Sequence, residues 1–280
     1  MPCGRAVARI VAAALLALLV LAGIGFGGIC VWFARNERAF VFQPVRRASI
    51  SPAAAGLKGV AEVTIATADG EHLYAWWSAP PPGHGAIIVL TGKGVVVSDY
   101  AGFFADLAAH RFGVLGIDYR GNGASTGTPS EEGLRADARA AFDFVRHAAP
   151  DAKIAVIGES LGTWPAIALA VDRPVAGVLL NSPYASVVRL FALRRPFLPY
   201  RLLMADPLDS EALIGRVHVP VMILHGTADR AIPIAEARRL YRAAHQPKTM
   251  IEVAGAAHVN VWFGATRDRA FAALTAWTAP

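Results

Sequence analysis

The sequence is poor in cysteine, and this shortage narrows what the chain can be. Its two cysteines, Cys3 and Cys30, lie in or beside one apolar segment near the N-terminus. The rest of the chain therefore has neither an internal disulfide nor a thiolate cluster for a metal. No long Lys/Arg run interleaved with aromatic residues follows the apolar segment, so we expect no nucleic-acid partner despite a formal net charge of +6.

Common motifs of metal and nucleotide binding are also missing. The sequence contains no H-E-x-x-H motif. The glycines of YRGNGASTG, at 121, 123 and 127, do not match the G-x-G-x-x-G spacing, and TGKG at 91–94 lacks the spacing of a P-loop. We therefore expect no cofactor and no metal, and we assign no residue to either role.

A long apolar run stands out in what remains. Between Ala6 and Phe33 the only charged residue is Arg9, and the run exceeds the roughly 20 residues that cross a bilayer as a helix. The run also continues well past Ala22, where a signal-peptide core would end, which favours a retained single-pass anchor over the alternative of a cleaved signal peptide. Arginines flank the run on both sides, so the side of the membrane on which the rest of the chain lies stays open.

Composition divides the chain into three parts. We expect a membrane anchor at residues 1–34, a linker at 35–59 and one soluble domain at 60–280. The linker is rich in Ala, Ser and Pro between Gln43 and Leu57. The third part is long enough for one α/β domain with a buried core.

Short apolar runs recur along this third part, each separated from the next by a segment of helix length. They are typical of buried parallel strands and lie at 86–90, 113–117, 154–157, 175–180, 219–224 and 249–253. Ahead of them, AEVTIATADGEHLYAWWSA predicts two strands joined by a turn at 69–70. The clearest helix begins at Glu131, after a capping Ser130, and ends near His147. This alternation predicts a mainly parallel central sheet with helices on both faces.

A serine with a glycine two positions before it and another two positions after it follows the run at 154–157. In a tight turn from strand to helix the serine adopts a strained backbone conformation, and side chains two positions before and after it would collide. Gly158 and Gly162 remove those side chains. The pattern predicts that Ser160 is a nucleophile, and that the N–H of Leu161, at the positive end of the new helix, stabilises an anion beside it.

An acid and a base follow in the chain order expected for this architecture. Asp229 comes after one predicted strand and His258 after the next. His258 would accept the serine proton, and Asp229 would orient and stabilise the imidazolium. The rival acids, Asp206 and Asp209, fit better as helix-start residues. His225, at the end of a strand, fits better as a packed structural residue.

Several motifs recur in order and resemble the α/β-hydrolase superfamily: DYRGNGASTGTPSEEGLRAD, GESLG, NSPYAS, PFLPYRLLMADPLDSEALIGRVHVPVMILHGTADRAIP and GAAHVN. More narrowly, they are similar to its branch of single-anchor serine hydrolases, which includes protein depalmitoylases and bacterial peptidase-like and lysophospholipase-like proteins. The resemblance covers the chain from about Val60 onward. It implies the α/β-hydrolase fold, the same three catalytic residues, and only a short lid insertion at 182–208.

One loop departs from the family pattern. The family usually has His-Gly after the first buried strand, whereas this chain has LTGKGVVVSDY, with Thr91 in place of the histidine. Gly92 is kept, and we expect the backbone N–H of Lys93 to be the second oxyanion donor beside Leu161. The Lys93 side chain would attract an anionic group or be solvated. The valines at 95–97 would line an acyl pocket or touch lipid, or else pack beneath the loop.

Taken together, these features predict a membrane-anchored serine hydrolase that cleaves an ester or thioester through an acyl-enzyme on Ser160. A small-molecule or lipid substrate with an acyl chain is favoured by the anchor and by the apolar loop after Lys93. Two alternatives stay open: an amidase or aminopeptidase with the same triad, and a non-catalytic binding module with a degenerate oxyanion loop. The sequence does not predict the oligomeric state.

Overall fold

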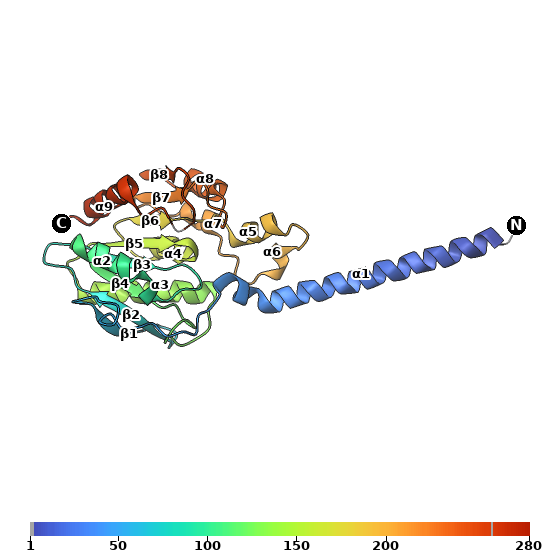
Figure 1. The fold of residues 1–280 in the computed structure, drawn as a ribbon, viewed down its shortest axis with the longest axis horizontal. Coiled ribbons are helices and arrows are strands. Elements are labelled where there is room, and N and C mark those ends of the chain that lie inside the picture. The colour runs from blue at the N-terminus through green and yellow to red at the C-terminus, as the bar shows by residue number, and fades with distance from the viewer. Residues whose placement is uncertain (1–2, 259) are drawn as a thin grey trace.

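The structure, a computed structural model, describes residues 3–258 and 260–280. An α/β body forms most of the molecule, and the N-terminal helix α1 (Cys3–Phe42) projects from it as a long rod (Figure 1). Met1 and Pro2 of the expected anchor, and Val259 of the GAAHVN motif, lie outside the described residues.

One eight-stranded sheet with the order β1-β2-β4-β3-β5-β6-β7-β8 forms the centre of the body. The strands are β1 (Ala61–Ala66), β2 (His72–Ser78), β3 (Ala86–Leu90), β4 (Gly113–Ile117), β5 (Ile154–Glu159), β6 (Val178–Asn181), β7 (Val221–Gly226) and β8 (Lys248–Val253). β1 and β2 form the predicted antiparallel hairpin, and the strands from β3 to β8 run parallel to one another. The predicted fold class is therefore confirmed.

Helices cover both faces of the sheet because side chains alternate along each buried strand. On β3, Ile88 belongs to one core cluster and Ile87 to the other. The first face is covered by α3 (Glu131–Ala148), α4 (Thr163–Asp172), α7 (Ser210–Ile214) and α8 (Ile234–Ala243), and the second by α2 (Ala101–Ala109) and α9 (Gly264–Thr278). Ser130 caps α3 as expected, since its hydroxyl accepts the Gly133 N–H at 3.0 Å.

A short cap lies in the insertion at 182–208 and consists of α5 (Val187–Arg194) and α6 (Tyr200–Leu203). The helix α1 does not end at the expected boundary of 34 but continues to Phe42, and its last turns pack against this cap. The ring of Phe33 lies edge-on to Tyr200 at 5.1 Å between centroids. Arg38 forms an ion pair with Asp206 at 2.7 Å. The first residues of the expected linker are therefore helical and fixed to the body.

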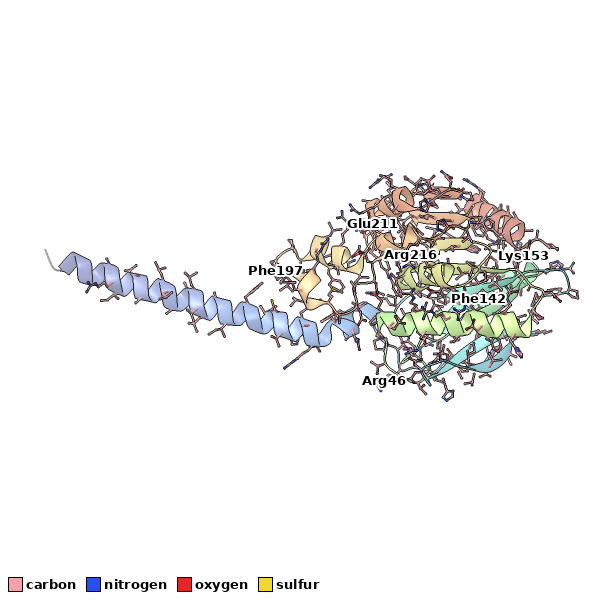
Figure 2. The ribbon with its side chains drawn as sticks, turned by 180° about the vertical axis from the view of Figure 1, so that it is seen from behind. Arg46, Phe142, Lys153, Phe197, Glu211 and Arg216 are labelled. Atoms are coloured by element: carbon pink, nitrogen blue, oxygen red, sulfur yellow. The ribbon has the colours of Figure 1, made fainter. Side chains whose placement is uncertain are left out.

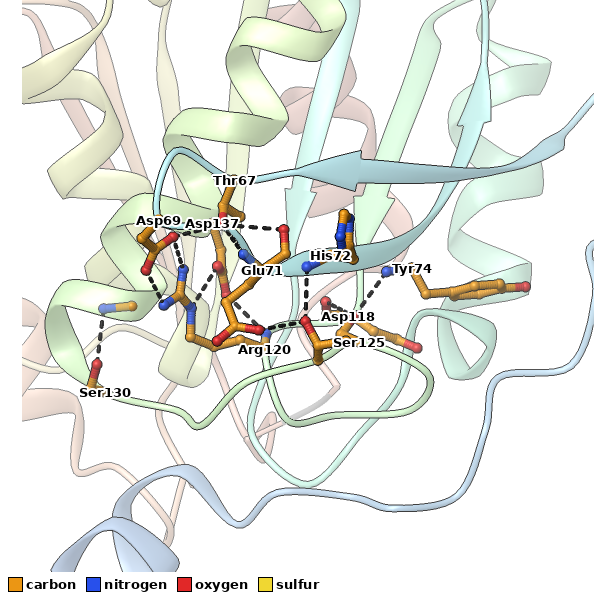
Figure 3. A network of polar contacts seen from close by, with 12 residues as sticks. Thr67, Asp69, Glu71, His72, Tyr74, Asp118, Arg120, Ser125, Ser130 and Asp137 are labelled. Atoms are coloured by element: carbon orange, nitrogen blue, oxygen red, sulfur yellow. Dashed lines mark hydrogen bonds and ion pairs between the residues drawn. The ribbon is translucent and has the colours of Figure 1, made fainter.

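A polar network joins the hairpin, the loop after β4 and α3 (Figure 3). Arg120 is its centre: Nε donates to the fully buried Asp137 at 2.8 Å, and Nη1 donates to Asp69 in the hairpin turn at 2.7 Å. In the same loop, Asp118 accepts the backbone N–H of Val97. Through this Asp118–Val97 hydrogen bond, the network fixes the loop after β3, which comprises residues 91–97.

Candidate active site

Ser160 lies in a sharp turn, the 3-10 helix η2 (Ser160–Gly162), between β5 and α4. Its φ angle is +50°, in the left-handed region that non-glycine residues seldom occupy. A Cβ atom on Gly158 would lie 2.5 Å from the carbonyl oxygen of Gly162. A Cβ atom on Gly162 would overlap the backbone carbonyl of Leu90 at the end of β3. The glycines therefore relieve clashes both within the turn and against the neighbouring strand.

A continuous hydrogen-bond chain links the three residues predicted as nucleophile, base and acid. Nε2 of His258 lies 3.0 Å from Oγ of Ser160, and Nδ1 lies 2.7 Å from Oδ2 of Asp229. The other carboxylate oxygen accepts the N–H groups of Ala231 and Ile232, both at 2.8 Å. Burial raises the pKa of Asp229, but the hydrogen bonds from His258 and Ile232 outweigh it and leave this pKa below its usual value. An ionised Asp229 favours a proton on Nδ1, which leaves Nε2 free to accept the serine hydroxyl.

Among the described residues, none of the rival residues hydrogen-bonds Ser160, although Nε2 of His225 lies 3.4 Å from Oδ2 of Asp229. Asp209 caps α7, and Asp206 accepts the N–H of Glu131 at the start of α3 at 2.7 Å. His225 is fully buried, and its Nε2 contacts the carbonyl oxygen of Ile232 at 2.9 Å. Burial lowers the pKa of His225, which keeps this ring neutral. Their placement agrees with the structural roles expected from the sequence.

A hydrogen-bond network that the sequence did not reveal holds the loop after β3 beside Ser160. It consists of Gly92, Tyr100, Glu159 and Asn181, and we call it the brace. The N–H of Gly92 donates to the Tyr100 hydroxyl at 3.2 Å, which in turn donates to Oε1 of Glu159 at 2.5 Å. Asn181 donates to the other oxygen of Glu159 at 3.0 Å. Burial and the Glu159 charge raise the pKa of Tyr100, so the phenol keeps its proton and acts as a donor. Glu159 stands directly before the nucleophile, but its partners lie far away in sequence.

The two expected oxyanion donors flank the same site. Gly92 lies close to the nucleophile, since a Cβ atom placed on it would be 3.6 Å from the Ser160 Cβ. The following Lys93 and the residue after the serine, Leu161, both line the pocket that contains Ser160. The backbone N–H of Lys93 forms no hydrogen bond with another described residue. This N–H group is therefore available to donate a hydrogen bond to a ligand.

The valines at 95–97 do not line this pocket, so that interpretation of the apolar loop is wrong. Val96 and Val97 are fully buried. Val97 belongs to the core cluster beneath α2 and α9. Sequence alone could not distinguish these outcomes, because an apolar run has the same composition whether it faces a ligand or the core.

The pocket instead takes its apolar walls from α1 and the cap. Its volume is about 200 Å³. Apolar walls come from Phe40 and Val41 of α1, from Val187, Leu190 and Phe191 of α5, and from Tyr184 and Ile232. Two cations, Lys93 and Arg194, also line it, and none of its lining residues is an acid. The contribution of α1 could not be predicted once residues 35–59 were assigned to a linker.

Several known proteins are similar to this chain in sequence or in fold. Residues 81–206 match the family model of hydrolases described as serine aminopeptidase, S33. An uncharacterized protein of Mycobacterium tuberculosis is 33% identical over 247 residues, which cover 87% of this chain and 88% of that protein. Human alpha/beta hydrolase domain-containing protein 17B is 30% identical over 173 residues, which cover 61% of this chain and 59% of that protein.

A solved structure shows the same fold. The esterase Pf2001 of Pyrococcus furiosus superposes with a TM-score of 0.68 over 85% of this chain and 99% of that chain, at 18% sequence identity. At this identity the likeness concerns the fold and does not extend to the substrate.

The brace predicts a specific kinetic effect for Tyr100→Phe. Without the hydroxyl, the Gly92 N–H loses its acceptor, and the loop that presents the Lys93 N–H loosens. Since removal of a whole oxyanion donor costs about 10²–10³ in rate, we expect kcat for p-nitrophenyl acetate to fall by about tenfold with little change in KM.

The matched control is Tyr74→Phe on β2, where the lost hydroxyl donates to Glu62 at 2.7 Å, away from the pocket lining. Equal kcat values for the two variants would contradict a positioning role for Tyr100.

Proposed function

The chain belongs to the α/β-hydrolase superfamily and is a hydrolase, and on this basis we propose that it cleaves carboxylic esters or thioesters through an acyl-enzyme on Ser160. One observation carries the proposal: the unbroken hydrogen-bond chain from the Ser160 hydroxyl through His258 to a buried Asp229. A serine hydroxyl is a weak nucleophile alone. In this hydrogen-bond chain His258 is the base, and Asp229 orients that base.

The proposed reaction has two stages. As Oγ of Ser160 attacks the acyl carbon, Nε2 of His258 takes the hydroxyl proton, and Asp229 stabilises the resulting imidazolium. The N–H groups of Leu161 and Lys93 stabilise the oxyanion, and His258 returns the proton to the departing alkoxide or thiolate. Water then attacks the acyl-enzyme with His258 again as base, which releases the carboxylic acid and restores Ser160.

We propose an acyl chain as the part of the substrate that enters the pocket. The walls supplied by Phe40, Val41, Leu190 and Phe191 are hydrocarbon or aromatic, and each methylene buried there contributes about 0.8 kcal/mol. The valines at 95–97 contribute nothing to these walls, since none of them lines the pocket and Val96 and Val97 are buried. Since α1 forms part of the wall, the same helix would both hold the enzyme at a bilayer and shape its pocket.

We further propose that α1 is a retained single-pass anchor. Its segment Val7–Phe42 is long and apolar enough to cross a membrane, although a signal sequence passes the same test. Cleavage near Ala22 would leave Ile24 and Trp32, at 66% and 55% exposure, in water on the remaining helix. The cap beside α1 exposes Phe197 and Leu202, and Figure 2 shows Phe197 at the end of the cap toward the free part of α1. Both features favour a body that rests on a bilayer.

The description of the matching family model favours aminopeptidase activity as a second candidate. The same three residues can cleave an amide. An aminopeptidase, however, needs an acidic group to hold the substrate ammonium, whereas the lining residues of this pocket include none and do include Lys93 and Arg194. Their positive charge would repel the ammonium, so ester or thioester cleavage is the better supported proposal.

Loss of the nucleophile tests the reaction. The full chain, purified in a neutral detergent, should hydrolyse p-nitrophenyl esters faster than aminoacyl p-nitroanilides. Ser160→Ala should lower kcat by about 10⁴-fold or more, because the triad acts as one unit.

The control variant is Ser130→Ala, which removes the hydroxyl that caps α3 and lies outside the pocket lining. It should retain turnover. A folded wild-type chain without activity on any ester would favour the binding-module alternative, and preferential cleavage of the anilides would favour the aminopeptidase.

A second prediction tests the acyl pocket. Leu190→Trp should fill part of the cavity and lower kcat/KM for p-nitrophenyl octanoate relative to the acetate by about tenfold, which corresponds to the loss of roughly two buried methylenes.

Leu193→Trp is the matched control, because Leu193 lies on the same helix but is 55% exposed and outside the pocket lining. The ratio of octanoate to acetate should stay at the wild-type value in this variant. Equal ratios in the two variants would contradict an acyl site along α5.

A further inference from the structure

Two cations face the proposed acyl pocket from opposite parts of the fold. Lys93 belongs to the loop after β3, next to Gly92 and the nucleophile, and Arg194 is the last residue of α5 in the cap. Both side chains are exposed while they line the pocket. They therefore lie where the apolar pocket meets solvent.

Backbone carbonyls hold both side chains in place. Nζ of Lys93 donates to the carbonyl oxygen of Phe40 at 3.4 Å, and Nη2 of Arg194 donates to that of Ala231 at 2.6 Å. Within the described residues, neither cation forms an ion pair with a carboxylate. A carbonyl orients a cation without cancelling its charge, so both positive charges stay available to a ligand.

The charges also act on each other. Partial desolvation at the pocket mouth lowers the pKa of the Lys93 ammonium, and the nearby Arg194 guanidinium lowers it further. The two positive charges at the pocket mouth repel each other. A bound anion between them would be attracted to both cations and would offset this repulsion. The pocket lining contains no acid that could serve this purpose internally.

We infer that Lys93 and Arg194 bind a negatively charged group of the substrate, so that the preferred substrate is a single-chain acyl ester with a phosphate near the ester bond. The inference rests on the proposed function. The acyl chain would fill the walls from α1 and α5, and the phosphate would lie at the mouth between the two cations. Arg194 offers a planar fork that suits phosphate oxygens, while Lys93 acts as a compact charge.

A pair of matched esters tests the inference. The full chain in neutral detergent micelles is given a monoacylglycerol and the corresponding monoacylglycerol phosphate with the same acyl chain, and the ratio of their kcat/KM values is measured. The wild-type ratio should favour the phosphate ester by about tenfold or more. Lys93→Gln and Arg194→Gln should each lower the ratio by about three- to tenfold, and the double variant should lower it further. Added salt should also lower it, because exposed charges are screened.

Arg195→Gln is the control, because Arg195 is exposed beside Arg194 but does not line the pocket. Its ratio should equal that of the wild type. If the neutral ester is hydrolysed but the ratio is near one, or is unchanged in both single variants, the inference is wrong while the proposed function stands. If neither ester nor any activated ester is hydrolysed, the proposed function itself fails.

One further arm separates substrate binding from attraction to a charged surface. Anionic lipid is added to the micelles while the neutral monoacylglycerol is the substrate. If this lipid accelerates the wild type and not Arg194→Gln, the cations bind the lipid surface and the inference is overturned. No such difference supports binding of the substrate's own phosphate.

Discussion

The turn at Ser160 packs directly against the end of β3, and this close packing sets the positions of the other parts of the site. A Cβ atom on Gly162 would overlap the Leu90 carbonyl, so this position has no room for a side chain, and Gly92 lies in ordinary contact with the serine, 3.6 Å between its ideal Cβ position and the Ser160 Cβ. This contact brings the nucleophile, the start of α4 and the loop with Lys93 together. Tyr100 and Glu159 then fix the loop by hydrogen bonds across the same contact.

The parts of the fold that depend on local patterns could be predicted from the sequence. The first five apolar runs became strands, because four to six consecutive buried residues bounded by turns fit a sheet covered on both faces. The last run became the edge strand β8, in which only Ile251 and Val253 are buried. Ser160, Asp229 and His258 could be selected because parallel strands end at one edge of the sheet, so residues that follow different strands meet there. Chain order and topology together therefore bring distant residues into one hydrogen-bond chain.

Features that depend on packing between distant segments could not be predicted. The helix α1 continues to Phe42 because its last turns pack against the cap region, with Phe33 on Tyr200 and Arg38 paired with Asp206. The sequence of residues 35–59 alone does not indicate these contacts. The same packing places Phe40 in the pocket wall and gives Lys93 a carbonyl partner. The apolar anchor, the cap and the loop beside the nucleophile therefore form one continuous unit, which is consistent with an enzyme that takes acyl substrates at a membrane.

In the proposed reaction Ser160 is the residue that becomes acylated, so a reagent for activated serines should modify it. The most direct measurement is to treat the full chain in detergent with a fluorophosphonate, digest it and locate the phosphonyl group by tandem mass spectrometry. We expect one modified residue, Ser160, because its hydroxyl oxygen lies 3.0 Å from Nε2 of His258. A folded protein that carries no adduct, or carries it on another residue, would show that Ser160 is not the nucleophile.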